Sequence, residues 1–136
     1  MRREGYPNAW VASVVLFALS MQLTMAASAE KAITLTIDLQ SGFSGQLVTV
    51  QIDGHNVANT EAVTTNPSTG FGVRHIYRTG VGQKKLEISV VDGNKKKYLK
   101  QELIVETDTA IGIQYMQYMD EKDIALTLSR RPFIYD

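Results

Sequence analysis

The strongest constraint on the fold of this chain is an alternation of apolar and polar side chains with a period of two, which recurs from residue 33 onward. In the stretch Ile33–Leu39 every second residue is Ile or Leu, and the residues between them are Thr or Asp. Successive side chains of a β-strand point to opposite faces of a sheet, so this pattern is typical of a strand with one buried face. It predicts five strands, at residues 33–39, 48–53, 86–90, 99–105 and 124–129.

Two further segments carry a weaker form of the alternation, at residues 71–79 and 110–119. In the first segment His75 shares one face with Val73 and Tyr77. The second segment begins to alternate and then slips, which we interpret as a β-bulge near Met116. The sequence thus predicts about seven strands, and an eighth if residues 57–65 form a short edge strand.

Turn-forming residues separate these segments. Asp53-Gly54 and Asp92-Gly93 are dipeptides that favour tight hairpin turns. Because Asp92-Gly93 stands between two alternating runs, we expect those runs to pair as an antiparallel hairpin. Short strands separated by such turns at about ten-residue spacing indicate an all-β fold, namely a small immunoglobulin-like antiparallel β-sandwich, with a small barrel as the main alternative.

The first 29 residues carry the features of a secretory signal peptide. Arg2 and Arg3 give a basic start, and an apolar run follows from Trp10 to Leu19. Ser20 and Gln22 then interrupt the apolar segment, which suits a signal better than a membrane-spanning helix of about 20 apolar residues. We therefore expect a cleavable leader and no membrane span after its removal.

Small side chains before Glu30 indicate where this leader is cut. Ala27 and Ala29 form the A-x-A pattern that signal peptidase requires. Cleavage there divides the chain into a signal peptide, residues 1–29, and a β-sandwich domain, residues 30–136, which we expect to be periplasmic or secreted. The chain has no cysteine, and an exported domain without disulfides is more typical of a bacterial envelope than of animal extracellular modules.

A local pattern within residues 47–91 is similar to that of a known class of module. The pattern is Val48-x-Val50-x-Ile52-Asp53-Gly54, followed by Gly82-x-x-x-Leu86-x-Ile88-x-Val90. It resembles PEGA-type and other immunoglobulin-like modules of bacterial envelope proteins, although the Pro-Glu-Gly-Ala stretch is missing. The resemblance implies a sandwich with an extracytoplasmic accessory role, and it implies no catalytic function.

The sequence gives no support for catalysis or for metal binding. The absence of cysteine excludes a thiol nucleophile, and neither His55 nor His75 stands in a nucleophile-elbow motif. Two distant histidines without cysteine or a carboxylate at ligand spacing make a poor zinc site, and Asp120–Asp123 lacks the spacing of calcium loops. We therefore predict a protein that is not an enzyme and that holds no metal or cofactor.

Lysines are concentrated around the expected Asp92-Gly93 hairpin, at Lys84, Lys85, Lys95, Lys96, Lys97 and Lys100. If pairing gathers them into one basic patch, the patch would suit an anionic polymer. The alternative, which we favour, is that lysines on an edge hairpin oppose sheet-to-sheet aggregation. Lys and Arg together number 14, as do Asp and Glu, so we expect no nucleic-acid partner.

The main functional prediction is a non-catalytic binding or structural module that contacts an envelope protein or a glycan. A carbohydrate-binding module is one alternative, with Tyr98 and Tyr118 as exposed rings that could stack on sugars. A small protein inhibitor that presents the long loop 56–72 is another. We expect the apolar C-terminal tail, Arg130–Asp136, to pack across the sandwich instead of inserting into a partner.

Overall fold

The structure is a computed structural model that describes residues 31–136. The expected signal peptide, with Ala27 and Ala29, lies outside the described residues. The described part contains no helix, and its strands are β1 (Ala32–Leu39), β2 (Ser44–Ile52), β3 (His55–Thr64), β4 (Val73–Gly80), β5 (Gly82–Asp92), β6 (Lys95–Val105), β7 (Thr109–Tyr118) and β8 (Glu121–Ser129).

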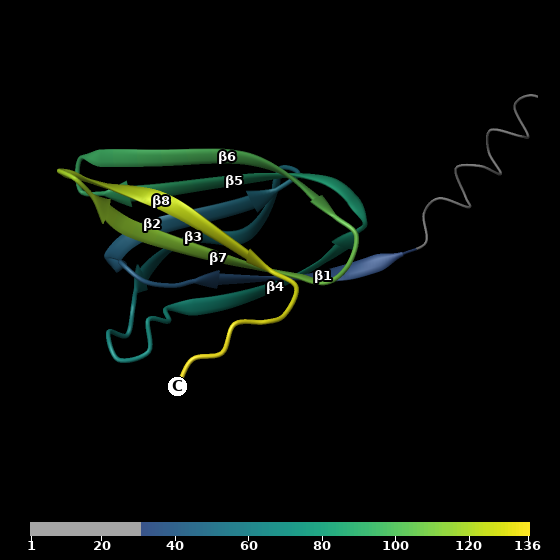
Figure 1. The fold of residues 1–136 in the computed structure, drawn as a ribbon. Coiled ribbons are helices and arrows are strands. Elements are labelled where there is room, and N and C mark those ends of the chain that lie inside the picture. The colour runs from purple at the N-terminus through teal and green to yellow at the C-terminus, as the bar shows by residue number, and fades with distance from the viewer. Residues whose placement is uncertain (1–30) are drawn as a thin grey trace, which may run out of the picture. The chain divides into compact units, whose positions relative to one another are not determined.

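The eight strands form two four-stranded sheets that pack as a sandwich (Figure 1). The β1 sheet has the order β4-β1-β7-β8, and the β2 sheet has the order β3-β2-β5-β6. The expectation of an all-β fold in two layers is therefore confirmed. The expectation of wholly antiparallel pairing is wrong for one pair, because β1 and β7 are parallel. A parallel pair needs a long connection, and β2 to β6 supply it.

Residues 56–72 do not form one long loop, because β3 occupies most of the segment. β3 pairs with β2 at the edge of the β2 sheet, and its register shifts at three places. These shifts explain why the strand shows little alternation in the sequence. The expectation of an edge strand here is confirmed, and the expectation of a loop is wrong for residues 56–64.

The β-bulge expected near Met116 is also absent. β7 and β8 pair continuously, from Ala110 opposite Ser129 to Tyr118 opposite Glu121. The apparent slip has another cause. Tyr115 is the last buried residue of β7, and both faces of the strand are exposed beyond it, so the sequence no longer needs to alternate there.

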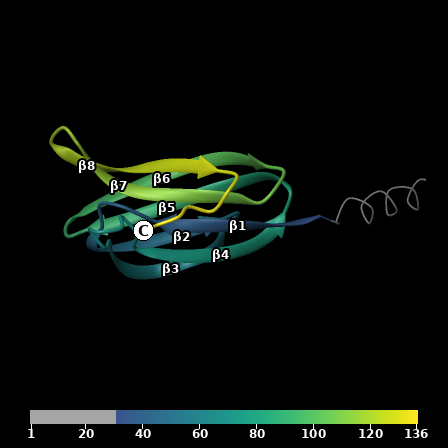
Figure 2. The ribbon, with the colours of Figure 1, turned by 60° about the horizontal axis from the view of Figure 1, so that its bottom comes forward.

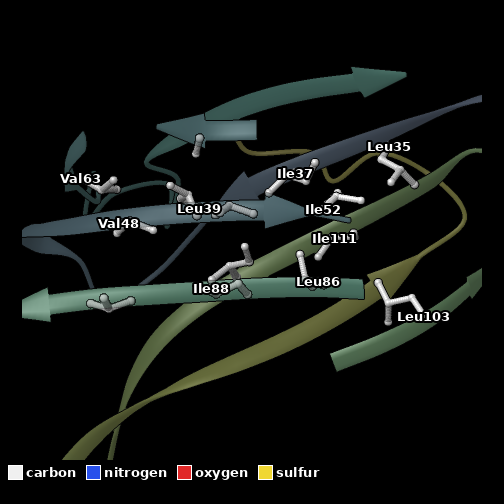
Figure 3. Packing of buried hydrophobic residues seen from close by; sticks show 14 of the residues in the cluster. Leu35, Ile37, Leu39, Val48, Ile52, Val63, Leu86, Ile88, Leu103 and Ile111 are labelled. Carbon is white, nitrogen blue, oxygen red and sulfur yellow. The ribbon is translucent and has the colours of Figure 1, made fainter. Parts of the chain in front are cut away.

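The apolar faces of both sheets meet in one core (Figure 3). In Figure 3 the labelled side chains of β1 and β7 point toward those of β2 and β5. The largest fully buried side chains of this core are Tyr115, Leu35, Ile37, Leu39, Ile52, Leu86, Ile88, Ile111, Ile113, Val48, Val50 and Val90. The strands with the clearest alternation thus supply most of the core. β8 is less buried than expected, because it is an edge strand and Leu128 remains half exposed.

The C-terminal tail packs across the outer face of the β1 sheet, as expected (Figure 2). The Tyr135 hydroxyl donates to Asp38 Oδ2 at 2.8 Å, and the Tyr135 ring lies 4.6 Å from the ring of Phe71, centre to centre. Arg74 donates to Asp38 through two nitrogens, at 2.7 and 2.8 Å, and also to the Phe133 carbonyl. The tail therefore covers a carboxylate that is completely buried.

Polar side-chain contacts join the two sheets along both edges. His75 on β4 contacts Glu61 on β3, as the shared face of His75 with core residues suggested. At the other edge, Lys97 on β6 pairs with Glu121 on β8 at 2.7 Å. The Lys97–Glu121 contact also lines the cleft that is described in the next subsection.

Candidate functional site

Two hairpins turn at the same end of the sandwich and enclose a cleft between them. The β5–β6 hairpin turns at Gly93-Asn94 and the β7–β8 hairpin at Met119-Asp120; Figure 1 shows both turns at its left. The cleft has a volume of about 440 Å³ and is lined by Asp92, Lys95, Lys96, Lys97, Tyr115, Gln117, Asp120, Glu121 and Lys122.

Tyr115 links this cleft to the core. Its ring is buried and stacks with Phe43 at a centroid distance of 5.9 Å. Its hydroxyl donates to Asp92 Oδ2 at 3.0 Å, and the ammonium group of Lys122 lies 5.4 Å from its ring centre. Burial, together with the hydrogen bond to Asp92, raises the pKa of Tyr115 to about 12. Tyr115 is therefore neutral at physiological pH and acts as a structural support.

The charges of the cleft are only partly paired. The Lys97–Glu121 contact lowers the pKa of Glu121 and raises the pKa of Lys97, chiefly through their hydrogen bond. Within residues 31–136, Lys95 and Lys96 make no ion pair. The β5–β6 turn thus presents two free ammonium groups beside the acidic β7–β8 turn.

The tip of the β7–β8 hairpin is an exposed apolar projection. We call Met116, Tyr118 and Met119 the apolar prong. Met116 and Tyr118 share one face of β7, and the exposed fractions are 51% for Met116, 73% for Tyr118 and 86% for Met119. Asp120 and Asp123 flank the prong and line a shallow depression with Tyr118 and Met119. The prong therefore combines apolar side chains with an acidic border.

Met119 also has an unusual backbone conformation, with φ of 56°. A tight hairpin turn requires positive φ, which Gly, Asn and Asp adopt most readily. The two other tight hairpin turns of the domain contain Asp53-Gly54 and Gly93-Asn94, so they follow this rule. Only the prong places a long apolar side chain at such a position among the hairpin turns of the described chain. The left-handed conformation costs an L-residue about 1–2 kcal/mol.

The six lysines expected to form a basic patch do not lie together. Lys95, Lys96 and Lys97 directly follow the β5–β6 turn. Lys84 and Lys85 lie near the other end of the hairpin, about 25 Å away along β5. Lys84 pairs with Asp53 at 3.6 Å. Lys100 lies between these groups and is opposite Glu87. The hairpin pairing was predicted correctly, but the length of its strands separates the charges.

Tyr98 and Tyr118 are both exposed, but they lie on different surfaces. Tyr98 is on the outer face of the β2 sheet, with 58% of its surface exposed. Desolvation, together with the neighbouring Glu87 carboxylate, raises its pKa. Tyr118 belongs to the prong. The two rings line separate depressions and cannot form one sugar-binding platform.

The described residues also bear on metal sites and membrane helices. Within them, no group of three or more His, Asp or Glu side chains is placed to hold a metal ion. His55 is exposed next to the β2–β3 turn, and the His75 ring contacts the Glu61 carboxylate. Residues 31–136 include no helix with the length and hydropathy needed to cross a bilayer. The absence of a cofactor and of catalysis remains a prediction.

Two features were not found by sequence reasoning. The buried contact of Asp38 with Arg74 and Tyr135 joins residues far apart in the chain, and Asp38 occupies a position in β1 that normally faces solvent. The apolar prong was missed because its residues were interpreted as a bulge. A signal for the prong was present, since Tyr118 and Met119 stand next to three acidic residues in a segment that contains neither Gly nor Asn.

No protein-family model matches the chain, and no curated protein matches its sequence.

Proposed function

We propose that this chain is an exported, non-catalytic binding module with an immunoglobulin-like sandwich, and that it binds a partner protein through the apolar prong. The leader-like residues 1–29 support export to the periplasm or the exterior. The local resemblance of residues 47–91 to PEGA-type modules supports an accessory role in a bacterial envelope assembly. The prong supplies the contact surface.

The observation that carries this proposal is Met119. Its side chain is 86% exposed, and its backbone has the strained positive φ. A glycine or asparagine at this position would relieve the strain and remove an apolar side chain from water. Strain of this kind persists where the residue is needed for function, and exposed apolar clusters mark interaction sites.

The charges near the prong indicate the chemistry of the partner. Asp120 and Asp123 border the prong and have no ion pair in the described part of the chain. These carboxylates would be repelled by an anionic membrane surface. The partner is therefore a protein with an apolar pocket for Tyr118 and Met119 and cationic residues at its rim. The inhibitor alternative is less well supported, since its long loop is largely the strand β3.

Photocrosslinking in the producing cell tests this proposal. A photoreactive amino acid replaces Tyr118 in one version of the chain and His55 in another. His55 is exposed after the β2–β3 turn, at the end of the sandwich away from the prong. We expect a discrete protein adduct from position 118 and none from position 55. Met119→Gly in the first version should reduce the adduct. Equal adducts from both positions, no adduct at all, or an adduct that Met119→Gly leaves unchanged would contradict the proposal.

The same variant gives a second, independent result. Met119→Gly should raise the free energy of unfolding by about 0.5–1 kcal/mol, because relief of the left-handed strain exceeds the added flexibility of glycine in the unfolded chain. Urea denaturation followed by circular dichroism measures this change. If Met119→Gly weakens partner binding and stabilises the fold, Met119 is present for contact with the partner and not for stability. A destabilised variant would contradict our account of Met119.

A further inference from the structure

The outer face of the β2 sheet carries a second candidate site that is separate from the prong. Here three adjacent strands, β2, β5 and β6, form a shallow depression of about 150 Å³. Its lining consists of Thr49, Gln51, Glu87, Ser89, Lys96 and Tyr98. Tyr98 contributes the only aromatic ring of this lining, and the other five side chains are polar.

Strand register explains why the ring is accessible. Thr49 pairs with Ser89, and Ser89 pairs with Tyr98, so the three residues form one row across the sheet. Ser89 is small, and it leaves space beside the phenol ring. In the next row Gln51 pairs with Glu87. The aromatic ring and the hydrogen-bonding groups are thus presented side by side on a rigid sheet.

Contacts with β3 hold part of this surface in place. Gln51 Nε2 donates to Asn56 Oδ1 at 2.8 Å, and the hydroxyl groups of Thr49 and Thr60 are 2.7 Å apart. Side chains that are fixed before a ligand arrives lose less conformational entropy on binding. The polar row is therefore better suited to a ligand than freely rotating side chains would be.

The charge of the depression limits the type of ligand. Its lining contains one carboxylate, from Glu87, and one ammonium group, from Lys96. An anionic polymer would gain no net attraction from this pair. A neutral ligand with many hydroxyl groups can use the carboxylate and the Gln51 amide as hydrogen-bonding partners and the Tyr98 ring as an apolar surface.

We propose that this face binds a neutral polysaccharide, with a sugar ring stacked on Tyr98 and its hydroxyl groups bound by Gln51 and Glu87. At 150 Å³ the depression is smaller than the 300 Å³ or more of typical small-molecule pockets. It accommodates a single sugar unit, and the rest of the polymer lies on the open sheet. This site goes beyond the proposed protein contact, because it lies on another face and uses none of the prong residues.

Affinity electrophoresis of the full chain as the cell exports it tests the proposal. Native gels contain soluble glucan, mannan or xylan, and retardation of the protein measures binding. We expect at least one of these polymers to retard the wild type, and Tyr98→Ala to weaken the retardation about tenfold. Tyr118→Ala, which removes a ring that is even more exposed but lies elsewhere, is the matched control and should have no effect.

Two additional measurements separate stacking from other causes. Tyr98→Phe keeps the ring and should retain most of the binding, whereas an effect equal to that of Tyr98→Ala would overturn the stacking role. Added salt should leave retardation unchanged. Loss of retardation at high ionic strength would contradict the proposal that the ligand is neutral. Failure of all three polymers to retard the wild type, or an equal effect of Tyr118→Ala, would overturn the site itself. None of these results depends on the prong.

Discussion

At the scale of single residues, Gly42 is the position where the fold has least room. Its φ is 95°, and a Cβ atom there would lie 1.8 Å from the backbone oxygen of Tyr115. We expect Gly42→Ala to lower the free energy of unfolding by about 3 kcal/mol or more, because backbone clash adds to conformational strain. Gly45→Ala is the matched control, since Gly45 has φ of 96° but open space around it, and it should cost about 1 kcal/mol. Equal effects in urea denaturation would contradict the close approach.

Tyr115 and Tyr135 make the stability of the domain sensitive to alkaline pH. Burial raises the pKa of each hydroxyl to about 12, from an ordinary value of 10.0. A raised pKa means that folding favours the neutral phenol, so the stabilisation is complete below pH 10 and is lost as pH rises toward 12. Unfolding free energy measured from pH 8 to 12 should therefore fall above pH 10. Tyr115→Phe and Tyr135→Phe together should reduce that fall, and an unchanged slope would contradict the assignment.

Several individual side chains could be placed from the sequence, and others could not. The alternation put Leu35 and Ile88 in the core and Tyr98 outside, because side-chain direction in a strand depends only on position. Asp38 was unpredictable from this rule. Its position faces outward, and only the distant tail buries it.

At the scale of elements, the C-terminal tail acts as a cover for the β1 sheet. Truncation after Pro132 removes the Tyr135 hydrogen bonds with Asp38 and Gln40, the contact with Phe71, and the Phe133 carbonyl that Arg74 binds. We expect a loss of about 2–3 kcal/mol in the free energy of unfolding. Ile134→Ala, at a tail position that is 86% exposed, is the control and should change little. A truncated chain as stable as the full chain would contradict this role.

The elements themselves were largely predictable, and their failures have physical causes. Seven strands followed from alternation or turns, since each has one face against the core. β3 was ambiguous because its register shifts break the alternation. The end of β7 was misread because the hairpin extends beyond the opposite sheet, where neither face needs to be apolar. Patterns in a sequence report burial, so they fade where an element leaves the core.

At the scale of the whole molecule, export gives a direct prediction. Protein isolated from outside the cytoplasm should begin at Glu30 and lack Trp10, because we predict that Ala27 and Ala29 direct cleavage. N-terminal sequencing and intact mass measure this. Ala27→Phe should block processing, whereas Ser28→Phe, between the two required positions, should not. A mature protein that retains the first 29 residues would contradict cleavage.

Sites were harder to predict than layers because a site depends on distance along strands as well as on pairing. The six lysines share one hairpin, yet its long strands spread them from one end of the hairpin to the other. The cleft residue Asp92 comes from the β5–β6 hairpin, whereas Tyr115 and Lys122 come from the β7–β8 hairpin, and only the packed sandwich brings the two hairpins together.

The parallel pairing of β1 with β7 has a consequence for the order in which the domain assembles. β1 contains the first residues of the sandwich, but one of its two partners is not available until residue 109 and beyond. Any process that delivers the chain from its N-terminus must leave β1 incompletely paired while β2, β3, β5 and β6 can already associate. The β2 sheet is thus expected to form as an early intermediate with an open apolar face. Closure must wait for the end of the chain, and during that interval the exposed apolar face and the unpaired edge of β1 would make the unfinished domain prone to aggregation.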